Sequence, residues 1–264
     1  MTKNYATLQN KEGAMAYDKK MLGLFVDVGR EMLQSGAEIG RADTTIKLMG
    51  LAYGAARMDI LAITDYLVVT MSLPDGVEYT ITRRIEGGST DFSRIEALNE
   101  LSRSFCTKPF SEQELRERLD GIRNNHIGNI KKYAGTMMVG FMFSAFFGGS
   151  LLDAIVCCAL AFPACFLGGN LSRLCSSNIF YNFLCALFSG IMACIAAMII
   201  PTVHLDKLMI GLIMIFIPGR ALTNSIKDIF LGDTLSGMMR MTEALFCGAA
   251  IAFGFIIPVY VTGI

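Results

Sequence analysis

The chain has 264 residues, a mean hydropathy of +0.49, and 23 acidic and 23 basic residues. This hydropathy is too high for an ordinary soluble domain, and the zero net charge argues against binding to nucleic acid through a basic surface. The charges are unevenly distributed, because 36 of the 46 charged residues precede Tyr133 and 10 follow it. We therefore expect a soluble first half and a membrane-embedded second half.

The first 13 residues are polar, so we expect a flexible N-terminus, and they lack the apolar core of a signal peptide. Seven of the eight cysteines lie in the apolar half and none forms a CxxC pair. We interpret the cysteines as small packing residues rather than disulfide partners or metal ligands. No metal or other cofactor is expected.

Residues 14–125 show the pattern of a small α+β domain, which we expect to be cytoplasmic. Apolar residues recur at helical spacing before and after a region of three strand-like runs. Pro74-Asp75-Gly76 is typical of a hairpin turn, and Asp91 and Ser111 are candidate helix N-caps. The expected order is ααβββαα, with the helices on one face of an antiparallel sheet; the expected helices and strands cover 14–35, 38–53, 58–64, 66–73, 77–82, 91–105 and 111–124.

Motifs for catalysis are missing from this domain. It has no glycine-rich phosphate loop, no HExxH zinc motif and no GxSxG nucleophile motif. The two histidines, His126 and His204, lie in different halves, so a catalytic triad is hard to assemble. We therefore expect that the protein is not an enzyme, and a membrane-tethered hydrolase is the weakest alternative.

Charged residues cluster at two places in the domain. Glu38, Arg41 and Asp43 lie at the start of the second helix, and Arg83-Arg84 end the last strand. Glu38, Arg41 and Arg84 are candidates for a small-ligand or partner site. The same residues are also compatible with a solvated surface of ion pairs.

Residues 126–264 contain five apolar stretches, from which we predict five membrane helices at about 133–149, 151–169, 179–200, 207–230 and 235–261. Basic residues in the connecting segments favour a cytoplasmic N-terminus and an external C-terminus. The predicted outer side has only Lys207, and the predicted inner side has Arg123, Lys131, Lys132, Arg173 and Lys227.

The fourth membrane helix is predicted to be broken. Leu208–Gly219 provides twelve uncharged residues, which as a helix measure roughly 18 Å against the ~30 Å of a bilayer core. Pro218 lacks a backbone N–H, and Gly219 relaxes the backbone. We expect a break at this pair and a second half-helix from about Arg220.

The predicted half-helix offers groups suited to a small zwitterion or acid. Its N-terminus carries partial positive charge, and Arg220, Thr223 and Asn224 add a charge and polar groups, which suits a carboxylate. Asp228 lies on the same face as Asn224 and is suited to an ammonium group or a proton. The remaining candidates for substrate binding are Asp233, Ser236 and Arg240. Alternatively, these charged residues all lie in a cytoplasmic loop.

The segment from Ile217 to Met241 resembles the motif of the bacterial threonine/serine exporter family, including its short succinate-exporter-type members. The matching residues are Pro218, Gly219, Leu222, Asn224, Asp228, Gly232, Gly237 and Arg240. The stretch MLQSGAEIGRADTTI in the first half is similar to the family's L-x-x-x-G-A-E segment. Arg220 departs from the family pattern, because related chains often have an apolar or small residue there; its charge favours a more anionic substrate.

The resemblance covers roughly residues 15–264 and implies a cytoplasmic domain followed by five membrane helices that export small amino or carboxylic acids. It also implies that a short chain works with a separate small membrane protein as a hetero-oligomer. We expect a subunit of a proton-linked exporter of threonine and serine, with Asp228 or Asp233 as the proton-linked group. The alternatives are a succinate exporter subunit and a membrane receptor or scaffold whose cytoplasmic domain is the functional part.

Overall fold

The computed structural model describes residues 2–263 except residues 64, 89, 126–127, 172–174 and 176; the side chains of residues 2–15 and 129 are also left out. His126, and Arg173 with its contribution to the predicted orientation, lie outside the described residues. The structure is mostly helical, with a three-stranded antiparallel sheet. It divides into two compact units.

The first unit contains Met1–His126 and, unexpectedly, Asn224–Met238 from the second half of the chain. Its main elements follow the predicted order ααβββαα. Their bounds are α1 Thr2–Gln34, α2 Ile39–Tyr53, β1 Arg57–Ala62, β2 Tyr66–Ser72, β3 Glu78–Arg84, α3 Phe92–Thr107 and α4 Glu112–Asn124.

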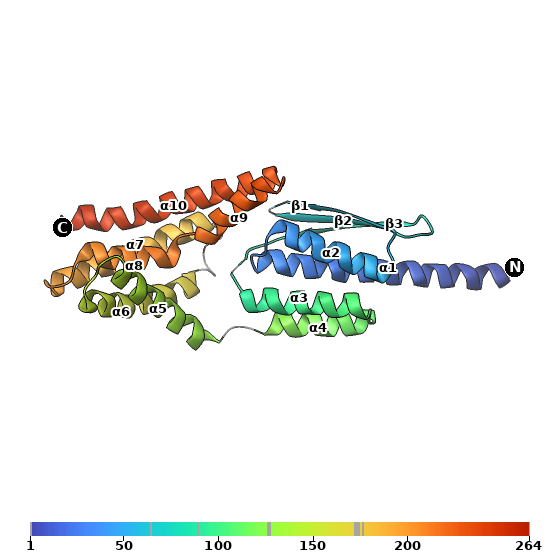
Figure 1. Cartoon of the computed structure of the whole chain (residues 1–264), viewed down its shortest axis with the longest axis horizontal. Helices are drawn as coiled ribbons and strands as arrows, with labels where there is room; N and C mark the ends of the chain where they lie inside the picture. The colour runs from blue at the N-terminus through green and yellow to red at the C-terminus, as the bar shows by residue number, and fades with distance from the viewer. Residues whose placement is uncertain are drawn as a thin grey trace. The chain divides into compact units, whose positions relative to one another are not determined.

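All four helices lie on one face of the sheet, as predicted. Figure 1 shows α1 and α2 against the sheet, with α3 and α4 packed on the other side of these two helices. The central strand β2 buries Leu67, Val69 and Met71 toward the helices. Phe25 of α1 meets Phe105 of α3 edge to face, with ring centroids 5.3 Å apart. The core therefore joins sheet and helices into a single hydrophobic cluster.

The predicted turn and caps are confirmed. Gly76 takes a positive φ of 85°, which glycine adopts without strain, between the paired strands β2 and β3. The Asp91 side chain accepts the Arg94 N–H at 2.9 Å, and the Ser111 hydroxyl accepts the Glu114 N–H at 3.3 Å.

Helix α1 begins at Thr2, whereas the sequence predicts a helix start at Ala14 and a flexible segment before it. Residues 2–13 contain no proline, and alanine, leucine, glutamine, lysine and glutamate among them all favour helix. Helix α1 therefore extends to Thr2 without an apolar face there. Packing nucleates the helix further along the chain, and residues of high helix propensity are sufficient to extend it.

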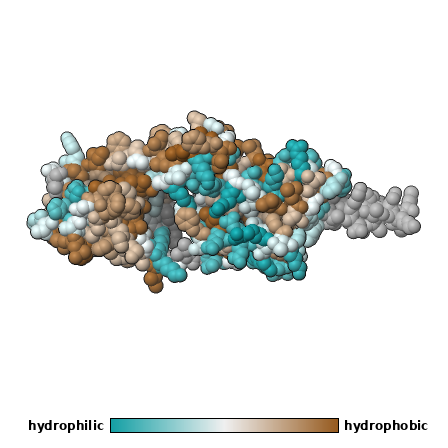
Figure 2. Space-filling model, in the orientation of Figure 1, coloured by the Kyte–Doolittle hydropathy of each residue, from teal (hydrophilic) through white to brown (hydrophobic). Residues whose placement is uncertain are grey.

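The second unit contains Ile127–Thr223 and Met239–Ile264. Its helices are α5 Asn129–Phe146, α6 Leu151–Leu171, α7 Asn178–Ile199, α8 Leu205–Phe216, the first turn of α9 Gly219–Phe230, and most of α10 Thr234–Thr262. Within the described residues, α6, α7 and α10 are long and apolar enough to cross a membrane. The predicted number of five crossings stays a prediction. Figure 2 shows hydrophobic residues over much of the visible surface of this unit.

Small residues allow close contact between the apolar helices. A Cβ added at Gly254 of α10 would lie 2.8 Å from the Phe183 carbonyl oxygen and 2.7 Å from the Ala186 Cβ, both on α7. Backbones that approach this closely are typical of membrane helices, whose association depends on van der Waals packing.

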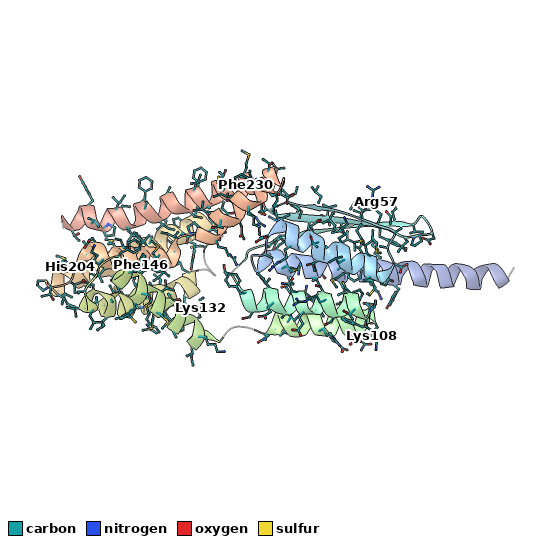
Figure 3. All side chains as sticks on the ribbon, in the orientation of Figure 1. Arg57, Lys108, Lys132, Phe146, His204 and Phe230 are labelled. Carbon is teal, nitrogen blue, oxygen red and sulfur yellow. The ribbon has the colours of Figure 1, made fainter. Side chains whose placement is uncertain are left out.

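Asp153, at the start of α6, forms hydrogen bonds that hold the loop before α8 against α6. Its carboxylate is fully buried and accepts hydrogen bonds from the Ser150 N–H at 2.7 Å and the Ser150 hydroxyl at 2.8 Å. It also accepts the His204 N–H at 2.8 Å and faces the His204 Nδ1 at 3.0 Å. His204 is labelled in Figure 3.

We expect that Asp153→Asn will destabilise the protein by about 2–4 kcal/mol, because the new amide would face donors and leave buried N–H groups unsatisfied. Thermal unfolding of the purified protein in detergent measures this change. Asp206→Asn is the control, since Asp206 has a side chain 65% exposed. Equal melting temperatures for the two variants would contradict the expectation.

Candidate functional site

The chain between α8 and α9 breaks at the predicted pair. Helix α8 ends at Phe216 after twelve residues, Ile217 leaves helical geometry with ψ of 125°, and α9 begins at Gly219. Two short helices therefore replace one membrane-length helix. Interrupted helices of this kind hold substrates and ions in secondary transporters.

The start of α9 offers fewer open amides than the sequence suggested. The Gly219 N–H donates to the Ile217 carbonyl at 2.8 Å, and the regular i→i−4 bonds of α9 begin with the Leu222 N–H, which donates to the Pro218 carbonyl at 3.1 Å. Thr223 donates its hydroxyl proton to the Gly219 carbonyl at 2.9 Å, so in this structure its oxygen is an acceptor. A carboxylate therefore depends on the remaining donors, and Thr223 is better suited to an ammonium group.

The segment 224–238 buries three polar side chains and exposes most of its large apolar ones, with Lys227 the exposed charge. Ser225 and Asp228 of α9 are fully buried, whereas Ile226 and Phe230 are 46% and 85% exposed. The same pattern continues into α10, where Ser236 is 5% exposed. The exposed large side chains here are Ile226, Phe230, Leu231, Leu235 and Met238. An apolar outside and a polar inside suit contact with lipid or another apolar surface, not bulk water.

Polar contacts connect this segment to the α+β domain within the first unit. The Lys227 ammonium lies 2.6 Å from the Glu38 carboxylate, with side chains 51% and 32% exposed. The Asn224 amide donates to the Gly36 carbonyl at 3.5 Å, and the Ser236 hydroxyl donates to the Ala62 carbonyl at 3.3 Å. The segment is thus held at the turn after α1, the start of α2 and the end of β1.

Helices α9 and α10 touch backbone to backbone inside this unit. A Cβ added at Gly237 would lie 2.7 Å from the Ser225 carbonyl oxygen and 3.0 Å from the Ile229 nitrogen. Only glycine fits at this crossing without a shift of one helix.

The predicted site residues divide between the two units. Asn224, Asp228, Asp233 and Ser236 belong to the first unit, together with Glu38, Arg41 and Arg84. Pro218, Gly219, Arg220, Thr223 and Arg240 belong to the second, where Arg220 and Arg240 lie within electrostatic range of each other.

The cytoplasmic candidates are not brought together among the described residues. Glu38 contacts Lys227, Arg84 lies 3.6 Å from its neighbour Glu86, and Arg41 is exposed. Arg83, rather than Arg84, faces the helices, because adjacent residues of a strand point to opposite faces.

Asp43 is an acidic neighbour of the segment. Burial raises the pKa of its carboxyl above the usual value, Lys47 lowers it, and Asp233 raises it. Since the folded-state pKa is the higher one, ionised Asp43 destabilises the fold at neutral pH, and this cost disappears as the pH falls through the folded pKa.

We expect that Asp43→Asn will raise the melting temperature at about pH 7 and that the gain will shrink toward about pH 4. Unfolding of both proteins across this range measures the difference. Asp65→Asn, the same change at an exposed position, is the matched control. A difference that is independent of pH would contradict the assignment.

Sequence reasoning missed Ser225 and the pairing of Lys227. Ser225 could have been found from its spacing, since it lies three residues before Asp228 on the same helix face. The partner of Lys227 could not, because Glu38 is 189 residues away in the chain.

An interrupted helix and three apolar helices of membrane length are features of the class of membrane proteins that includes secondary transporters.

Residues 24–261 match the family model described as "Putative threonine/serine exporter", so the chain belongs to the threonine/serine exporter family. A curated relative, "Probable threonine/serine exporter" of Mycobacterium tuberculosis, is 24% identical over 246 residues. The match covers 91% of this chain and 46% of that protein, so the chain spans about half the length of the relative. No solved structure matches.

Proposed function

We propose that the chain is a subunit of a secondary exporter that moves threonine and serine out of a bacterial cell across the inner membrane. Family membership supports an exporter. The observation that carries the proposal is the polarity of the segment after the helix break, with Asp228 buried and Ile226 and Phe230 exposed.

The groups beside the break suit an amino acid. The carboxylate of Asp228 attracts an ammonium group, and the Asn224 amide and the Arg220 guanidinium attract a carboxylate. The hydroxyl oxygen of Thr223 lies on another face of α9 and offers a separate acceptor. Asp228 or Asp233 exchanges a proton during the cycle. We propose a carrier of this kind and not an enzyme.

Succinate is the second candidate substrate. The specific observation that favours it is Arg220, a full positive charge one residue after Gly219 at the start of α9. A guanidinium binds carboxylates in a bidentate manner, so a second acidic group would gain a partner here.

We further propose five membrane crossings, with the N-terminus in the cytoplasm and the C-terminus outside. Helices α6, α7 and α10 supply three of these crossings, and α5 and the α8–α9 pair supply the other two. A second small membrane protein completes the transport path. The relative of about twice the length supports a transport path divided between two chains, because its single chain has room for a second membrane half.

The test is efflux of labelled threonine, serine and succinate from loaded cells that express the chain with and without the candidate second subunit. We expect faster efflux of at least one compound when both proteins are present. No change for all three compounds, with both proteins found in the membrane, would overturn the proposal. A ligand for the cytoplasmic domain in the absence of efflux would instead favour a receptor or scaffold.

A further inference from the structure

A separate pocket lies in the α+β domain between α1, β3 and α4. Its volume is about 610 Å³, which is within the usual range for sites that hold small molecules. None of the residues discussed for transport lines it. We refer to it as the α1–β3 pocket.

Four cationic side chains line the α1–β3 pocket: Lys19 and Lys20 of α1, Arg83 of β3 and Arg116 of α4. One acidic residue, Asp27, lines it as well. Four cations from three separate elements converge on one concave surface. Such an arrangement concentrates the field and attracts anions.

Internal ion pairs neutralise only part of this charge. Arg83 pairs with Asp27 at 3.0 Å, and Arg116 pairs with Glu112 at 3.0 Å. Lys20 lies 4.0 Å from the same Glu112, so two carboxylates face four cations. Lys19 has no ion pair within the part of the chain that the structure describes. The pocket therefore keeps an excess of about two positive charges.

The floor of the pocket is kept open by Gly23 of α1. A Cβ at this position would lie 3.7 Å from the Arg83 Nη2 and 3.7 Å from the Ile81 Cδ1. A methyl group fits there without a clash, but a larger side chain would project into the space that a ligand needs. Leu24 and Ile81 add an apolar wall.

We propose that the α1–β3 pocket binds a small anion with two acidic groups, a dicarboxylate or a phosphorylated metabolite. Two charges match the uncompensated cations. Lysine ammonium groups bind carboxylate and phosphate oxygens alike, as point charges. This site is distinct from the segment proposed for transport.

Isothermal titration of the purified full-length protein with inorganic pyrophosphate and with succinate tests the site, with threonine as the zwitterionic control. At least one of the two anions should bind. Lys19→Gln combined with Lys20→Gln should weaken that binding about tenfold or more. Gly23→Val should weaken it equally by occupying space without removing charge.

Lys47→Gln combined with Lys108→Gln is the matched control, because both lysines are exposed and lie outside the pocket. This variant should bind like the wild type. Whichever anion binds distinguishes phosphate from carboxylate chemistry. Failure of both anions to bind, or wild-type affinity in either pocket variant, would overturn the proposal.

Discussion

Replacement of Asp228 by asparagine is expected to reduce export at least about tenfold without loss of the protein from the membrane. The side chain is fully buried on α9, one turn after Asn224. Asparagine keeps its shape and volume, so packing should survive, but it removes both the negative charge and the site for a proton. A buried charge in a membrane protein is costly and is retained where function requires it.

The measurement is the initial rate of efflux of the compound that the wild type exports, normalised to the amount of protein in the membrane. Asp206→Asn is the matched control, because it makes the same chemical change at an exposed position at the start of α8. It should export at the wild-type rate. A wild-type rate for Asp228→Asn would remove Asp228 from the mechanism.

Gly237→Ala is expected to separate α9 from α10 and to lower both stability and export. The added methyl group would lie 2.7 Å from the Ser225 carbonyl oxygen, which is backbone and cannot rotate away. Overpacking of this kind costs about 1–3 kcal/mol. Because Ser225 and Asp228 lie on the same face of α9, a shift of this helix also displaces the buried carboxylate.

Gly248→Ala provides an internal comparison on the same helix, since a Cβ there meets no atom within 4 Å among the described residues. Alanine has the higher helix propensity, so this variant should be as stable as the wild type or slightly more stable. Melting temperatures and efflux rates of the two variants measure this difference. Equal behaviour of the two would show that the α9–α10 crossing tolerates a side chain.

Features that depend on neighbouring residues were predictable from the sequence. The break between α8 and α9 follows from a proline and a glycine in succession, and the β2–β3 hairpin follows from its turn residues. The caps at Asp91 and Ser111 are local for the same reason. Each depends on backbone geometry within a few residues, which the chain specifies directly.

Features that depend on distant partners were not predictable. The sequence placed Asn224 and Asp228 in the membrane half, but the structure groups them with the α+β domain through contacts such as Lys227 with Glu38. The occupied amide of Gly219 depends on how the chain turns at Ile217. Residue types alone determine neither the long-range contacts of the segment nor the path of the chain at the break.

The central claim is that polar residues of α9 hold the substrate. Its most direct test is equilibrium binding of labelled threonine, serine and succinate to the purified protein. Asn224→Ala removes one amide from this helix. We predict saturable binding of at least one compound by the wild type and a dissociation constant about tenfold higher for Asn224→Ala. Wild-type affinity in that variant, with its melting temperature unchanged, would contradict the claim.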